Sequence, residues 1–148
     1  FLSLAFLAQG PSFTVWSYQQ NASVRHSHTW ATFTDGRETV CVSWGPLGSV
    51  KLLGRRETGA NLTHEQTMKW AEFYGASVVK VGPIPCSPFL FARAKVQKAA
   101  LESGMIGYKA VYVAGRHRLN CVGAVASIGG PFTGGTLHGH AAGQGHFP

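Results

Sequence analysis

The sequence is poor in cysteine and in acidic residues, and it has neither a long apolar run nor an internal repeat. Its 148 residues include three cysteines, Cys41, Cys86 and Cys121, so a disulfide framework cannot account for all of them. No Cys-x-x-Cys pair occurs, which removes the usual support for a zinc ribbon or a thioredoxin-type redox site. No apolar stretch approaches the roughly 20 residues that cross a bilayer, so we expect no transmembrane segment.

Acidic residues number six against 13 Lys and Arg, which gives a formal net charge of +7. A nucleic-acid surface usually gathers its basic residues on one element and interleaves aromatic residues among them. Here the basic residues are scattered from Arg25 to Arg118, so we expect a solvated basic surface and no specific nucleic-acid site. A hydrophobic content of 45% over this length predicts one compact domain and excludes a disordered chain.

Strand patterns dominate the first third of the chain. Short apolar or alternating runs are separated by turn signals such as Asp35-Gly36. The expected strands cover residues 1–8, 12–18, 28–34, 39–44 and 50–55. Residues 1–7 also fit the apolar remnant of a signal peptide, which leaves the compartment open between the cytoplasm and export. Four or five strands joined by tight turns predict an antiparallel sheet.

Helix signals dominate the middle of the chain. Thr63 and Gln66 match a capping box and predict a helix that ends near residue 74. Ser87-Pro88 supplies an N-cap followed by proline, and apolar residues then recur at helical spacing until Gly104. The recurring residues are Phe89, Ala92, Val96 and Ala99. We expect them to form the apolar stripe of a second helix.

Shorter elements complete the expected fold. They are strands at 78–81, ended by Gly82-Pro83, and at 108–113, and a helix at 121–128. Asn120 is a suitable N-cap for that last helix. The prediction is an α+β domain over residues 1–130, with an antiparallel sheet packed with two or three helices, followed by a Gly/His-rich tail at 131–148.

Cys121 is the strongest candidate for chemistry. If Asn120 caps the helix, the thiol lies in the first turn, where free backbone N–H groups and the positive dipole end stabilise a thiolate. The basic run at residues 116–118 would add positive potential, so we expect a lowered pKa for this thiol. The alternative is a small buried apolar residue, which most free cysteines are.

His28 is the best-placed general base. A thiol nucleophile needs a group that takes its proton and returns it to the leaving group, and His is the usual choice. His28 opens an expected strand, which would hold its side chain in a fixed direction. His26 falls on the same face if the strand extends back, and it is the second choice.

The strand His28-Thr-Trp-Ala-Thr-Phe and the Asn120-Cys121 pair that opens a late helix resemble the circularly permuted papain-like proteins. This NlpC-type group includes lecithin retinol acyltransferase and many uncharacterised bacterial proteins, and in it the His strand precedes the Cys helix, as here. The resemblance covers residues 1–130 and implies a permuted papain-like fold with Cys121 as nucleophile and His28 as base. The family places a third polar residue on the next strand, where this chain offers Ser43.

The resemblance implies acyl transfer through a thioester, on a peptide, amide or acyl substrate and without a cofactor. Gln9, at the end of the first expected strand, is the candidate oxyanion donor, with a solvated strand end as the alternative. Water as acceptor would make the protein a peptidase or amidase, and another nucleophile would make it an acyltransferase. Both stay open.

A metal-binding protein is a competing interpretation. The pairs His26/His28 and His138/His140 each place two imidazoles on one face of an extended chain, and imidazole suits Zn, Cu or Ni. No carboxylate is spaced to join them, so we expect no specific metal site.

The third interpretation is a catalytically silent papain-like module that binds a peptide or glycan. Four tryptophans could line a groove for such a ligand if they were exposed. They are Trp16, Trp30, Trp44 and Trp70.

Overall fold

Eight strands and three helices form within residues 10–20, 23–46, 57–108 and 118–129, the part of the chain that the computed structural model describes. The strands are β1 (Ser12–Gln20), β2 (Ser23–Thr34), β3 (Thr39–Val42), β4 (Trp44–Pro46), β5 (Glu57–Asn61), β6 (Ser77–Pro85), β7 (Gly107–Tyr108) and β8 (Arg118–Leu119). The helices are α2 (His64–Phe73), α3 (Pro88–Glu102) and α4 (Cys121–Ala126). The α+β prediction is confirmed.

The main sheet has four antiparallel strands in the order β3-β2-β1-β6. β1 and β2 pair directly, with Tyr18 opposite His28. β3 accompanies β2 only as far as the pair of Ala31 with Val42. The His28 end of β2 therefore extends beyond the last pair that β3 makes.

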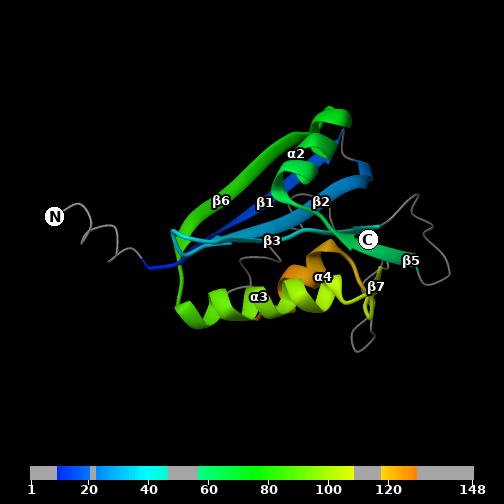
Figure 1. Cartoon of the computed structure of the whole chain (residues 1–148). Helices are drawn as coiled ribbons and strands as arrows, with labels where there is room; N and C mark the ends of the chain where they lie inside the picture. Colours follow the sequence, from blue (N-terminus) through cyan, green and yellow to red (C-terminus); the bar gives the residue numbers. More distant parts are fainter. Residues whose placement is uncertain (1–9, 21–22, 47–56, 109–117, 130–148) are drawn as a thin grey trace.

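The two faces of this sheet carry different helices. In Figure 1, α3 and α4 lie below the sheet and α2 lies above it. The larger core cluster joins Ala31 and Phe33 of β2 to residues of α3 and α4. A smaller cluster packs Tyr18 and Trp30 against Ala71 of α2. Successive strand residues point to opposite faces, so β2 supplies both clusters.

The second, smaller sheet has the order β4-β5-β7-β8. β4 and β5 are antiparallel, whereas the short strands β7 and β8 are parallel. A side chain at Gly59 of β5 would collide with the ring of Trp44 in β4. Glycine is therefore required where the buried indole crosses this sheet.

The helix starts follow local capping chemistry. Thr63 and Gln66 form the expected capping box at α2, and the Ser87 hydroxyl accepts the Leu90 N–H at α3. The Asn120 side chain accepts the N–H of Gly123 at α4, at 2.7 Å. Each cap satisfies a backbone donor that the helix cannot pair internally.

The expected apolar stripe of α3 was wrong. Phe89 is 71% exposed and Val96 is 69% exposed. The buried face of the helix instead consists of Leu90, Phe91, Ala94 and Leu101. Both sides of this helix carry apolar residues, and contact with the sheet selected the side that the periodicity did not indicate.

Two strand boundaries also differ from expectation. β6 does not end at Gly82-Pro83 but continues to Pro85, with an irregular register against β1 at the positive-φ Gly82. The single strand expected over 39–44 breaks at Ser43 into β3 and β4. The segments 1–8, 50–55 and 131–148, and most of 108–113, lie outside the described residues.

Candidate functional site

His28 lies on β2 within an aromatic environment. Its ring centroid is 5.7 Å from that of Tyr18 on β1 and 5.7 Å from that of Trp30, two residues along its own strand. The side chain is buried, with 8% of its surface exposed. Burial lowers the pKa of His28 to about 4, because the imidazolium loses its hydration there. His28 is therefore neutral at pH 7.

Ser43 provides the hydrogen-bond partner of this imidazole. The Nε2 atom of His28 lies 2.8 Å from Ser43 Oγ. Ser43 Oγ in turn lies 2.7 Å from Oγ1 of Thr67 on α2. The structure thus brings together two of the predicted site residues and adds Thr67.

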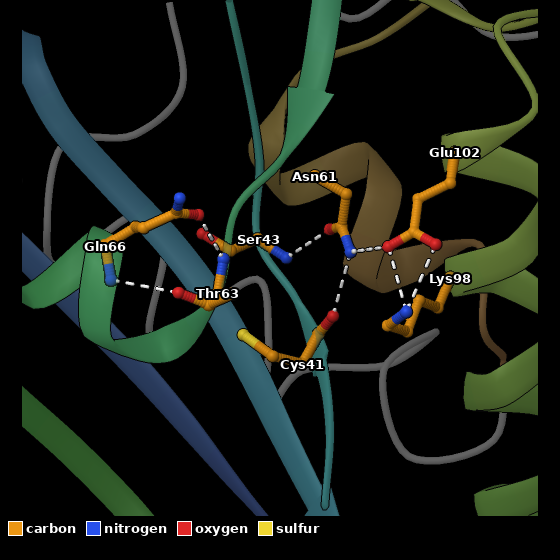
Figure 2. A network of polar contacts seen from close by, with 7 residues as sticks. All are labelled: Cys41, Ser43, Asn61, Thr63, Gln66, Lys98 and Glu102. Atoms are coloured by element: carbon orange, nitrogen blue, oxygen red, sulfur yellow. Dashed lines mark hydrogen bonds and ion pairs between the residues drawn. The ribbon is translucent and has the colours of Figure 1, made fainter.

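The backbone of Ser43 is held as firmly as its side chain. Its N–H donates to Asn61 Oδ1 at 2.8 Å, and Asn61 Nδ2 donates to the carbonyl of Cys41 at 3.0 Å. Figure 2 shows this clamp, in which Asn61 also reaches Glu102 of α3. The Ser43 carbonyl accepts the N–H of Leu62 at 2.8 Å. These bonds stabilise the break between β3 and β4 that turns Ser43 toward His28.

Cys121 is the first residue of α4 and is 5% exposed. Burial raises the pKa of its thiol to about 11, although the backbone N–H groups of Thr29, Val122 and Cys121 itself oppose this. The expected lowered pKa is therefore wrong for this structure, because desolvation of the thiolate outweighs the helix start. The influence of the Thr29 N–H places the thiol against the peptide unit that joins His28 to Thr29.

The described contacts give no hydrogen bond between Cys121 and His28, whose Nε2 bonds to Ser43. Tyr18 is close to both, through its ring contact with His28 and an electrostatic interaction with Cys121. Burial, Tyr74 and Cys121, in that order, raise the pKa of the Tyr18 phenol, so it remains a hydroxyl donor. The imidazole and the phenol lie with Trp30 on the α2 side of the sheet, whereas the thiol belongs to the core cluster on the α3 and α4 side, against the β2 backbone.

The structure does not describe several of the other predicted site residues. Gln9, residues 116 and 117 of the basic run, and His138 and His140 lie outside the described residues, as do the side chains of His26 and Arg118. Within the described residues, no cluster of three or more His, Cys, Asp or Glu side chains is placed to hold a metal ion. No helix in that same part of the chain has the length and apolar character to cross a membrane.

A groove lined by all four tryptophans does not form. Trp30 and Trp44 are fully buried, and the Nε1 of Trp30 donates to His64 Nδ1 at 3.0 Å. Trp16 is half-buried under Lys80, and Trp70, at 46% exposed, is the most open of the four. Core packing accounts for two of the four tryptophans, Trp30 and Trp44.

Sequence reasoning missed Thr67 and Asn61. Thr67 lies in the interior of a correctly expected helix and Asn61 at the end of β5, and no local pattern at either residue indicates a contact with Ser43. Their roles depend on how α2 and β5 pack beside Ser43, which no local pattern encodes.

Comparison of the sequence with protein-family models gave no match, and comparisons with curated proteins and with solved structures gave none either. The geometry and the chemistry of His28, Ser43 and Cys121 are therefore what indicates a function for this chain.

Proposed function

We propose that the protein is a thiol-dependent acyl hydrolase or acyltransferase of the permuted papain-like kind. The observation that carries the proposal is the buried His28, whose Nε2 is bound to a firmly held Ser43 while a thiol lies at the adjoining peptide unit. Among the described residues, Nδ1 of His28 has no hydrogen-bond partner. That atom is the one left to accept a proton.

The protonation states define how such a site would work. With a thiol pKa of about 11 and an imidazole pKa of about 4, Cys121 and His28 are both neutral at pH 7. The site therefore holds no preformed thiolate–imidazolium pair. His28 is already in the form that accepts a proton, so transfer from sulfur would accompany attack on the substrate.

In the proposed reaction, Cys121 Sγ forms a bond to the acyl carbon as its proton passes to His28 Nδ1. The leaving amine or alcohol takes that proton from the imidazolium as its bond to the acyl carbon breaks, and a thioester remains. Water or another nucleophile then attacks the acyl carbon and gives its proton to His28, the bond from that carbon to sulfur breaks, and the acid or transferred acyl product leaves. The imidazolium returns the proton to sulfur, which restores the thiol. The Cys121 backbone N–H at the start of α4 would help to hold the developing oxyanion.

Acylation of Cys121 is the direct test. The protein is incubated with a panel of p-nitrophenyl acyl esters and small peptide amides, and adducts are located by peptide-resolved mass spectrometry. We expect a thioester at Cys121 in the wild type and none in Cys121→Ala, with a slower reaction in His28→Gln. Cys86→Ala, which removes a half-buried thiol from another part of the fold, is the matched control and should react as the wild type does.

Acyl esters that modify Cys86 or Cys41 but never Cys121 would overturn the proposal. The second candidate function, a non-catalytic binding module, is favoured by one observation, the burial that raises the thiol pKa to about 11. That candidate predicts that Cys121→Ala leaves ligand binding unchanged.

A further inference from the structure

The hydroxyl groups of Thr67 and Ser43 form a chain that ends on His28. Its three links are Thr67 Oγ1 to the carbonyl of Thr63 at 2.8 Å, Ser43 Oγ to Thr67 Oγ1 at 2.7 Å, and His28 Nε2 to Ser43 Oγ at 2.8 Å. Thr67 and Ser43 are fully buried and His28 nearly so. All three side chains are therefore restricted to these partners and cannot turn to bulk water.

The donor and acceptor of every hydrogen bond among these hydroxyl groups follow from the carbonyl of Thr63, where the series begins. A carbonyl oxygen only accepts, so the single hydroxyl proton of Thr67 is committed to the carbonyl of Thr63. Thr67 Oγ1 must then accept from Ser43, which commits the only hydroxyl proton of Ser43. Ser43 Oγ must in turn accept, and the donor is the Nε2–H of His28.

We propose that Thr67 is a positioning residue that fixes the tautomer of His28, with the proton on Nε2 and the lone pair on Nδ1. Its action passes through Ser43, and its origin is the i to i−4 bond from the Thr67 side chain to the first turn of α2. A serine alone could donate to or accept from either imidazole form. The committed proton of Thr67 removes that freedom and makes Ser43 an acceptor only.

The inference rests on the proposed function only where it assigns His28 Nδ1 to accept the thiol proton of Cys121. If Cys121 is the nucleophile, the fixed tautomer keeps the basic atom of His28 ready for the thiol proton. The chain of hydroxyls itself requires no substrate, so it can be tested separately from catalysis.

Ring ¹⁵N chemical shifts of His28, measured by NMR on the full chain near pH 7, report the tautomer directly. We expect the Nε2–H form in the wild type. In Thr67→Val, which keeps the shape of the side chain and removes the hydroxyl, the Ser43 proton is free to donate to His28. The ratio of Nε2–H to Nδ1–H forms should then fall by about tenfold, the change that one neutral hydrogen bond produces.

Two variants separate this role from a structural one. Thr67→Ser retains the hydroxyl and should restore the wild-type tautomer. Thr14→Val removes the hydroxyl of a buried β1 threonine that lies outside the chain of hydroxyls, and it should leave the tautomer unchanged. If Thr67→Val does not fold, Thr67→Ala replaces it, and the wild-type spectrum still shows which nitrogen of His28 carries the proton.

An Nδ1–H tautomer in the wild type, or an unchanged ratio in the folded Thr67→Val variant, would overturn the inference. An Nε2–H tautomer together with a Cys121 that is never acylated would support the hydroxyl chain and overturn the acyl-transfer proposal. The two ideas therefore fail by different measurements.

Discussion

The burial of His28 predicts a specific loss of stability in acid. The pKa of this imidazole falls from 6.5 to about 4 on folding, because the aromatic environment excludes the water that would solvate the charged form. The unfolded chain thus binds the proton more tightly than the folded one. The corresponding stability is fully present above about pH 6.5 and is lost as the pH falls toward about 4.

The magnitude follows from the linkage relation. At about 1.36 kcal/mol per pKa unit, the difference between folded and unfolded His28 amounts to about 3 kcal/mol by pH 4. A single domain is typically stable by only about 5–15 kcal/mol, so this is a large part of the total. His28 alone should therefore make the fold markedly weaker below about pH 5.

Urea unfolding at several pH values, followed by tryptophan fluorescence, measures this effect, since Trp30 and Trp44 are buried in the folded protein. The comparison is His28→Gln, which removes the titrating group while its side-chain amide can still donate to Ser43. Between about pH 7 and pH 4 the wild type should lose about 3 kcal/mol more than the variant. Parallel pH profiles, or an NMR-measured His28 pKa near 6.5, would show that burial of His28 does not weaken the fold in acid.

Three further predictions concern the surrounding structure. Asn120→Ala removes a buried cap and should lower the free energy of unfolding in urea by about 1–2 kcal/mol, and a loss below about 0.5 kcal/mol would contradict its role. With iodoacetamide near pH 7, peptide mapping should show Cys86 modified well before Cys121, because burial holds the Cys121 thiol in its neutral form, and the reverse order would disprove this. Gly59→Ala should cost about 1–3 kcal/mol in thermal or urea unfolding, since the new methyl group meets the buried indole of β4. Gly45→Ala, where nothing lies within 4 Å, is its control, and equal effects of the two substitutions would argue against the collision.

Residue types and their order indicated only part of the candidate site. The pairing of His28 with Ser43 was expected only through resemblance to a family, and the structure shows the two side chains in hydrogen-bond contact. The thiol was correctly placed at a capped helix start. The shift of its pKa was predicted in the wrong direction, because the backbone N–H groups at the helix start favour the thiolate while the packing of the whole domain removes its water.

Local sequence is sufficient to specify the features that depend on residues within one turn of each other. The caps at Thr63, Ser87 and Asn120 belong here, because an N-cap side chain and the N–H it accepts lie about three residues apart. The buried face of α3 and the contact between Thr67 and Ser43 depend instead on tertiary packing. Exclusion of water and contacts between distant segments arise when α2, α3 and α4 pack on the sheet, and no local spacing specifies that packing.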